Sequence, residues 1–360
     1  MLIAPNKVPR VSRHFTDSRT IVMRLLDLIA QSREPLILVP RDDAAPITVS
    51  GPGDFAQQII ECPLRFVIAD DLTRASAELA FADGDRLADC LDLLRIPASS
   101  LWVEWNDAIH RQVICECGTV AQPDPDALGR QVGVLLHAAQ GGRSATARTF
   151  WTASNEAGER EAQISPVETY LDLDDRFAPT VDASRMLCGD YASVTDCRDA
   201  GVAELLQRVR FRFDPRWRKY YGVATRDADV RVDVIHKSLA AVAHDIPLIL
   251  AFFLLLNAKG ATRPLPIQRN ILNRKRLSRD RAPLLDHIEV HASLPGHEAA
   301  ESSTESSFGS RHSPRLHHVR GHLVRREDRV FWRMPHLRGN AFQGVVRSRT
   351  VCLSFARACD

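Results

Sequence analysis

The stretch Leu101-Trp102-Val103-Glu104-Trp105 decides the class of fold that the sequence predicts. Its first, third and fifth residues are apolar and alternate with a tryptophan and a glutamate. This two-residue period is typical of a β-strand whose two faces differ. We therefore expect a half-buried strand here, and the rest of the fold depends on what surrounds it.

Further strands are predicted on both sides, because short apolar runs bounded by proline, aspartate or glycine are typical of strands. They are Leu36–Val39, Leu64–Ala69, Arg111–Glu116, Gln131–Ala138 and Ala147–Trp151. Helices are predicted where apolar residues recur every three or four positions. They are Thr16–Gln31, Gly84–Leu94, Asp199–Val209 and Asp229–Ala258, the last broken or kinked near Pro247. Residues 152–198 show neither period. The predicted fold is α+β, with a mixed, mostly antiparallel sheet and flanking helices.

The longest apolar run, Ile246–Leu256, is too short for the ~20 residues that cross a bilayer, and it predicts a buried core helix. Pro5 and Pro9 interrupt the first residues, so we expect no secretory signal. The eight cysteines are scattered through a chain of 360 residues, which is long enough to fold without disulfide bonds. We therefore expect a cytoplasmic protein with reduced thiols and no membrane association.

Charge divides the chain into an acidic body and a basic end. Residues 260–360 hold 18 of the 47 lysines and arginines but only 9 of the 45 aspartates and glutamates, a net charge of +9. The preceding residues keep 29 and 36, a net charge of −7. Such basic surfaces attract phosphate backbones or acidic proteins. Composition predicts an α+β body at 1–259, a Pro/Arg-rich segment at 260–296, a flexible linker at 297–313 and a basic β-module at 314–360.

The basic end is predicted to form a β-hairpin module with strands at Leu316–Val324, Val330–Met334 and Val345–Phe355. If the first is one strand, alternation places His318, Arg320 and His322 on one face. Guanidinium groups bind phosphate or carboxylate oxygens in pairs, and an aromatic ring offers a surface for base stacking. The other residues expected to bind an anionic partner are Arg325, Arg326, Arg329, Trp332, Arg333, His336 and Arg338.

A second basic segment, Arg269–Arg281, carries six positive residues among thirteen and is flanked by prolines. We expect a positioned loop that contacts phosphate. Its candidate contacts are Arg274, Lys275, Arg276 and Arg279. The expected partner of both basic regions is nucleic acid, RNA rather than DNA, or an acidic protein or nascent-chain complex. An alternative stays open, in which the basic residues pair with the acidic body and have a structural role.

We expect neither a cofactor nor a metal ion. His318 and His322 would lie roughly 13 Å apart along a strand, which is too far for a shared ligand site. The sequence contains no glycine-rich phosphate loop, no nucleophile elbow and no zinc-protease motif, so we expect a binding protein in preference to an enzyme. Asp70 and Asp71 keep one enzymatic alternative open, a magnesium-dependent nuclease or nucleic-acid-processing enzyme.

Three features occur in this order: the apolar helix Leu248–Leu256, the segment from Asn273-Arg-Lys-Arg to Arg281-Ala-Pro-Leu-Leu-Asp, and Arg315 to His322 followed by Val330-Phe-Trp-Arg. On these residues the chain resembles a family carried by phages, prophages and plasmids that includes a type V-A anti-CRISPR protein. The strand at 101–105 adds a fourth point of likeness. Related tails carry Arg-Gly-His-Trp, whereas this chain has Leu323 after His322.

This resemblance covers the last third of the chain and scattered positions before it. It implies a host-interaction protein encoded by a mobile element and acting against host defence. In the family, that role is depletion of a CRISPR effector nuclease during its synthesis, by engaging the nascent N-terminal peptide and causing loss of the messenger.

Overall fold

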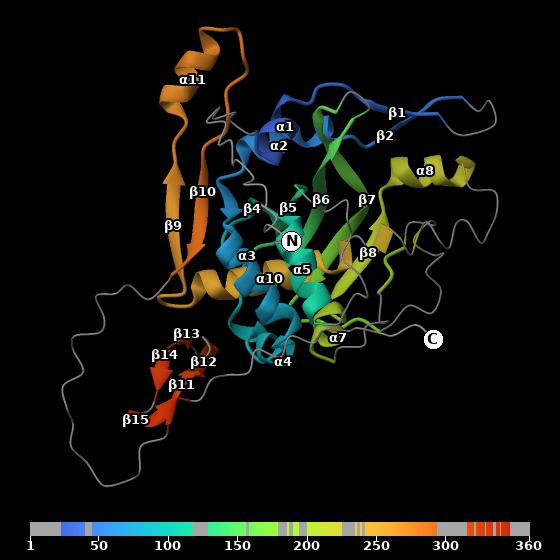
Figure 1. Cartoon of the computed structure of the whole chain (residues 1–360). Coiled ribbons are helices and arrows are strands. Elements are labelled where there is room, and N and C mark those ends of the chain that lie inside the picture. The colour runs from blue at the N-terminus through green and yellow to red at the C-terminus, as the bar shows by residue number, and fades with distance from the viewer. Residues whose placement is uncertain are drawn as a thin grey trace, which may run out of the picture.

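In the computed structural model, helices pack on both faces of one large sheet (Figure 1). The structure describes residues 23–39, 45–117, 129–155, 158–178, 186, 190–193, 200–224, 235, 238–239, 242–293, 315–319, 322–327, 329–333, 336–338 and 340–345. The predicted class is confirmed, because the fold is α+β with a mixed, mostly antiparallel sheet and flanking helices.

Eight strands form the main sheet in the spatial order β8-β7-β6-β5-β4-β3-β10-β9. Strands β10, β3 and β4 run parallel, and the other neighbours run antiparallel. The predicted segment 260–296 therefore shares its sheet with the predicted body. The bounds are β3 Leu64–Ile68, β4 Ser100–Asn106, β5 Gln131–Ala138, β6 Ser144–Ser154, β7 Arg160–Asp172, β8 Val209–Phe213, β9 Thr262–Ile267 and β10 His287–Ala292.

Helices on the two faces create two hydrophobic cores. The larger core lies under α3 (Asp70–Phe81), α4 (Gly84–Ala88), α5 (Asp107–Glu116), α7 (Ala200–Leu206) and α10 (Asp245–Asn257), beside the short turn η2 (Leu91–Leu93). The smaller core lies under α1 (Leu25–Gln31), η1 (Pro52–Phe55), α2 (Ala56–Glu61), α8 (Pro215–Ala224) and the hairpin of β1 (Leu36–Leu38) with β2 (Ile47–Val49).

Helix α10 is the buried core helix that the apolar run predicts, with eleven of its thirteen residues buried. The expected interruption near Pro247 is found as a break and not as a kink, because a turn at His244 separates the helical residues 242–243 from α10. The helix begins at Asp245, so Pro247 lies in the first turn, where backbone N–H groups have no partner within the helix. Proline therefore breaks no helical hydrogen bond here. Among the described residues, no helix is long and apolar enough to span a membrane.

Strand β4 is buried on both faces, which corrects the expectation of a half-buried strand. Trp102 packs in the smaller core, and the side chain of Glu104 is 0% exposed. The Glu104 carboxylate accepts hydrogen bonds from the backbone N–H groups of Leu25 and Leu26, each at 3.1 Å. It therefore holds the N-terminus of α1, and α1 covers the face that a half-buried strand would expose.

One further expectation is corrected, and one stretch without a prediction contains a strand. The strand expected at Arg111–Glu116 belongs to helix α5, because His110, Val113 and Ile114 lie on one buried helical face. The side chain of Asn106 caps this helix by accepting a hydrogen bond from the backbone of Ala108. The long strand β7 lies within the residues where no period was visible in the sequence.

Candidate anionic-partner interface

The basic C-terminal module forms two small sheets in the described residues, β14-β11-β15 and β12-β13. The expected single strand at Leu316–Val324 is wrong, because His318 lies in β11 and His322 in β12, which belong to different sheets. Alternation along one strand therefore does not place them on a shared face. Arg320 lies outside the described residues, and His336 and Arg338 lie in β14. The bounds are β11 Arg315–Val319, β12 His322–Arg326, β13 Arg329–Arg333, β14 His336–Arg338 and β15 Asn340–Val345.

One face of the hairpin β12–β13 packs against the body, and we call it the docked face. Leu323 pairs with Trp332, and Arg325 pairs with Val330, so these four residues share a face. Leu323 is 8% exposed and belongs to the larger core, and Val330 and Trp332 pack against that core. Trp332 is therefore partly buried against the body, and its expected role in base stacking stays a prediction.

Arg325 fixes the docked face through an ion pair. Its Nη1 and Nη2 atoms donate to the two carboxylate oxygens of Asp92 at 2.8 and 2.7 Å, and Nη1 also donates to the backbone oxygen of Asp89. The hydrogen bond from Arg325 lowers the pKa of Asp92 below its ordinary value. This arginine, expected to bind a partner, instead pairs with the acidic body, as the structural alternative predicted.

The opposite face of the hairpin carries Arg326, Arg329 and Arg333, and we call it the outward face. Arg326 and Arg329 are directly opposed across the hairpin, and Arg333 lies on the same side by alternation. All three side chains are exposed. None forms an ion pair or a side-chain hydrogen bond with another residue that the structure describes. The hairpin therefore holds three exposed cations away from its docked face, together with Val324 and Phe331, which alternation places between them.

The second basic segment forms the end of a projecting arm, made of β9, helix α11 (Asn270–Leu277) and β10 (Figure 1). The expected loop at Arg269–Arg281 is thus partly a helix. Asn273 holds it in place, because its Oδ1 accepts from the Leu284 backbone at 2.8 Å and its Nδ2 donates to the Leu284 carbonyl at 2.9 Å. Arg269 donates its backbone N–H to Asp286 at 2.6 Å.

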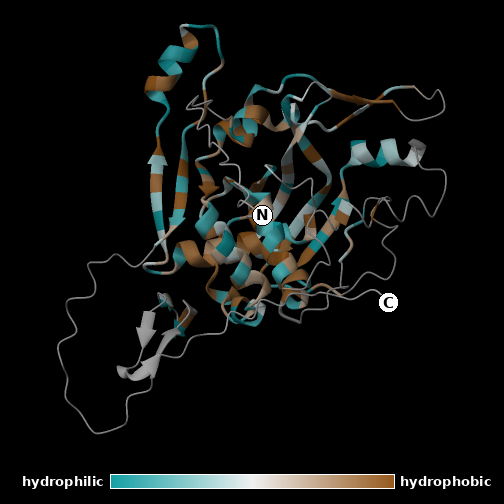
Figure 2. Cartoon of the chain, viewed as in Figure 1, coloured by the Kyte–Doolittle hydropathy of each residue, from teal (hydrophilic) through white to brown (hydrophobic). Residues whose placement is uncertain are grey.

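Three of the four cations predicted on this segment stay available at the arm tip. Arg274, Lys275 and Arg279 are exposed, and within the described part of the chain none of their three side chains forms an ion pair or a hydrogen bond. Arg276 differs, because its Nε donates to the Ala282 carbonyl at 2.7 Å and stabilises the turn after α11. Figure 2 shows hydrophilic and hydrophobic residues side by side on this helix, where Ile271 is 75% exposed.

A pocket of about 430 Å³ lies at the carboxyl ends of the parallel strands β10, β3 and β4, and Asp70 and Asp71 line it. Both aspartates begin helix α3, a position that favours carboxylates. Asp70 accepts a hydrogen bond from Asn106 at 3.2 Å, and Asp71 accepts one from the Leu72 backbone at 2.7 Å. Across the described ranges, no three His, Cys, Asp or Glu side chains come together as a metal site. The two carboxylates thus have the contacts of helix-terminal residues.

A buried cluster that the sequence did not indicate lies on α5 and α10. Asp107, His110 and Asp245 are at most 1% exposed, and His110 Nδ1 lies 3.7 Å from Asp107 and 3.9 Å from Asp245. Burial alone would raise the pKa of Asp107, but contact with His110 and the charges of Arg111 and Arg130 lower it to about 2. Burial raises the pKa of Asp245 to about 8. One carboxyl is therefore ionised and the other protonated at neutral pH.

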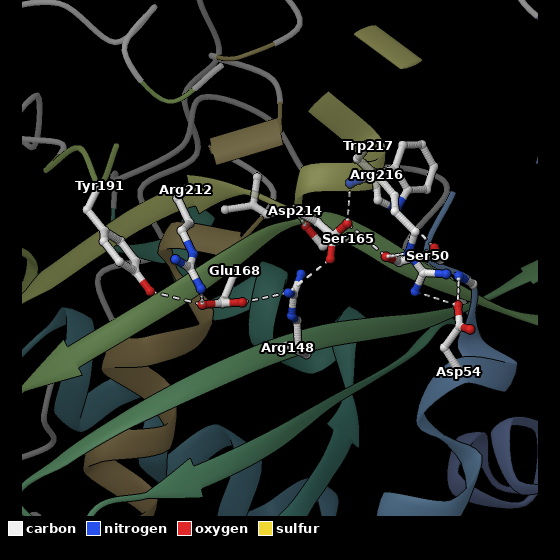
Figure 3. Close-up of polar contacts among 12 residues, drawn as sticks. Ser50, Asp54, Arg148, Ser165, Glu168, Tyr191, Arg212, Asp214, Arg216 and Trp217 are labelled. Carbon is white, nitrogen blue, oxygen red and sulfur yellow. Dashed lines mark hydrogen bonds and ion pairs between the residues drawn. The ribbon is translucent and has the colours of Figure 1, made fainter. Parts of the chain in front are cut away.

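A second network joins strands near the opposite edge of the sheet (Figure 3). Arg148 lies between Glu168 at 2.5 Å and Asp214 at 3.0 Å. Glu168 also accepts hydrogen bonds from Tyr191 and Arg212. Burial and this carboxylate raise the pKa of Tyr191 to about 12. The network connects β6, β7 and β8 to the start of α8, and its role is structural.

Comparisons with known proteins add no relative, since no protein-family model, curated protein or solved structure matches this chain. The likeness to the phage and plasmid family therefore stays a prediction. Position 323, where the tails of that family carry tryptophan, is a packing position in this fold.

Proposed function

We propose that this chain is a binding protein that holds RNA through the outward face of the hairpin β12–β13. The observation that supports this is the separation of the hairpin's two faces. Arg326, Arg329 and Arg333 are exposed and unpaired within the described residues, while the opposite face is fixed to the body. Cations held on a docked element need less ordering when a ligand binds, which favours affinity.

RNA is the partner that the chemistry of this face favours. All three cations are arginines, whose planar guanidinium groups bind phosphate oxygens in pairs and also stack on bases. An exposed hairpin face offers no deep groove, and such a surface suits a single strand whose bases are open to stacking. Because the strong, salt-dependent part of binding comes from phosphates, DNA of the same sequence is the necessary comparison.

The biological setting that we propose is conflict between a mobile element and its host. The resemblance to the phage and plasmid family supports a host-interaction role, anti-CRISPR-like, in which the bound RNA belongs to a messenger or to a complex holding a nascent chain. A cell assay tests this setting separately. The chain is expected to protect a plasmid targeted by a type V-A CRISPR system, and a failure to protect would contradict the setting while leaving RNA binding intact.

Fluorescence anisotropy with a 16-nucleotide RNA tests the binding itself. The affinity of the unmodified chain is measured between 50 and 300 mM salt and compared with that of Arg326→Ala/Arg329→Ala/Arg333→Ala. Each phosphate contact to a single strand contributes about 0.7 to the slope of log affinity against log salt, so the variant is expected to lose about 2 from this slope.

A matched control removes the same charge elsewhere. Arg33, Arg86 and Lys219 are exposed residues outside the hairpin and the arm, so Arg33→Ala/Arg86→Ala/Lys219→Ala lowers the net charge by the same three units. It is expected to keep nearly all of the affinity and slope. Equal losses in the two triple variants would contradict the proposed interface, because bulk charge would then explain the binding. Unchanged melting temperatures confirm that both variants fold.

A further inference from the structure

The arm places a second basic surface at a defined distance from the hairpin. Lys259, just before β9, forms a parallel bridge with Phe331 of β13, so the hairpin lies at the base of the arm. Strand β9 has six residues, which span about 20 Å at the usual rise per residue. Helix α11 lies beyond the far end of this strand (Figure 1). The arm tip and the outward face are therefore separated by at least the length of β9.

The arm is anchored to the body, so this separation is set by the fold. The Leu285 backbone donates to the buried carboxylate of Asp27 at 2.7 Å. The Arg65 side chain donates to the backbone oxygen of Asp286 at 2.8 Å. Both contacts are made by residues that follow α11 in the chain, just before it returns to the sheet as β10. They hold the returning strand against α1 and β3.

The outer edge of the arm is basic and poorly suited to adding another strand. β9 is the last strand of the sheet, and Pro264 and Pro266 carry no backbone N–H to donate to a neighbour. Arg263 is exposed at the base of β9. It forms no ion pair with another residue of the described part. The edge thus places the positive charge of Arg263 between the outward face and the arm tip. It does not favour pairing with a β-strand of another protein.

We infer that the arm tip and the outward face hold one RNA strand at the same time, with the strand running along β9. Arg274, Lys275 and Arg279 provide the second set of phosphate contacts. This inference rests on the proposed RNA binding and adds a length requirement to it. A ligand must span at least about 20 Å, which a stacked single strand rising about 3.4 Å per nucleotide covers in about six nucleotides. Single nucleotides and very short oligomers reach one surface only.

Simultaneous contact has a measurable consequence. Once one surface holds the RNA, the other meets it at a high effective concentration, so a long strand gains affinity from both surfaces. An RNA too short to reach both surfaces gains no affinity from the second surface. The effect of removing the arm tip must therefore grow with RNA length.

The test measures affinities for RNAs of 4, 8 and 16 nucleotides by fluorescence anisotropy at constant salt. The variants are Arg274→Ala/Lys275→Ala/Arg279→Ala at the arm tip, the triple alanine variant of the outward face, and the charge-matched control. For 16 nucleotides, loss of the arm tip is expected to weaken binding at least tenfold, because three phosphate contacts are removed. For 4 nucleotides the same variant is expected to bind within about threefold of the unmodified chain.

The outcomes separate this inference from the proposed function. If the unmodified chain fails to bind the 16-nucleotide RNA, the proposed function itself is wrong. If RNA binds and the arm-tip variant matches the control at every length, only the two-surface inference is overturned. A 20-residue polyglutamate that binds as tightly as the 16-nucleotide RNA would overturn the choice of RNA as the partner. The variant Arg274→Lys/Arg279→Lys keeps the charge and is expected to retain the dependence on length.

Discussion

Two hydrogen bonds of 2.8 and 2.7 Å join the guanidinium of Arg325 to the carboxylate of Asp92, residues separated by 233 positions in the sequence. Arg326, the next residue, belongs to the outward face and has no such partner among the described residues. Adjacent arginines in one basic run therefore have different roles, one structural and one available to a ligand. Alternation along β12 decides which is which.

Reversing one charge of this ion pair is expected to loosen the docking of the hairpin, and reversing both charges is expected to restore it. Arg325→Asp and Asp92→Arg each place like charges together, so amide hydrogen exchange in β12–β13 should become faster in both single variants. The double variant Arg325→Asp/Asp92→Arg re-forms the pair and should recover most of the protection. Exchange rates that stay high in the double variant would show that the ion pair does not hold the docked face.

The same ion pair predicts that the docked hairpin becomes less stable at acid pH. Arg325 lowers the pKa of Asp92 in the folded state below its ordinary value of 3.8. A lowered pKa stabilises the folded state above the unfolded value, and this contribution is lost as the pH falls through the folded value. Protection of the hairpin should therefore decrease below about pH 4 in the unmodified chain. In Asp92→Asn the decrease should be smaller when exchange is corrected for its intrinsic pH dependence.

Glu104 is expected to be a large contributor to stability. In Glu104→Ala, the backbone N–H groups of Leu25 and Leu26 lose their buried acceptor, and so does the Trp102 indole, which lies 3.3 Å away. Each unsatisfied buried donor costs about 1–3 kcal/mol, so urea denaturation should show a loss of at least about 3 kcal/mol. Burial raises the pKa of Glu104, and the neutral Glu104→Gln keeps one oxygen that can accept from Leu26 and Trp102 but not from Leu25, so it should lose less than Glu104→Ala. Equal losses would contradict the capping role.

Because Asp245 is buried, the free energy of unfolding is expected to fall as the pH rises. Burial raises its pKa in the folded state from 3.8 to about 8, and neither carboxylate oxygen has a hydrogen-bond partner among the described residues. Between these values the folded state binds a proton that the unfolded state has released, so this group lowers stability by about 1.4 kcal/mol per pH unit. Asp245→Asn should remove this slope and be the more stable form at pH 8. Parallel pH profiles for the two proteins, measured by urea denaturation, would contradict the prediction.

Gly133 is expected to tolerate no side chain. A Cβ atom there would lie 2.1 Å from the Trp102 ring, which is fully buried against β5. Gly133→Ala should therefore destabilise the protein by about 1–3 kcal/mol or more, as other overpacked cores do. Gly222→Ala is the matched control, because Gly222 lies in α8 and a Cβ atom added to it would have no described neighbour within 4 Å. It should gain up to about 1 kcal/mol from helix propensity, and thermal unfolding would compare the two.

Part of this fold could be predicted from local patterns. Strand β5 has the bounds predicted for it, Gln131–Ala138, and the apolar run at 246–256 lies within the buried helix α10. In both cases the period or the uniform hydrophobicity extends over eight or more residues. Helix α5 has the local pattern of a strand because its apolar residues Val113 and Ile114 are adjacent, and the buried His110 that completes its helical face is polar.

The candidate site was predicted less completely. The sequence located the basic regions, including the three outward-face arginines, but it could not show that Trp332 and Arg325 pack against the body. It also gave no sign that the arm joins the main sheet, because the pairing of β10 with β3 joins residues more than two hundred positions apart, such as Ile288 and Phe66. Such contacts depend on the whole chain and leave no short-range pattern.

By itself, the sequence determined the α+β class, the buried core helix and the concentration of positive charge in the last hundred residues, because hydrophobic period and composition are local properties. Only the tertiary structure decided that Leu101-Trp102-Val103-Glu104-Trp105 is covered on both faces, since α1 lies over Glu104. It also decided which arginines remain available. An arginine is neutralised only where the fold brings a distant carboxylate to it, as it brings Asp92 to Arg325 and no described carboxylate to Arg326, Arg329 or Arg333.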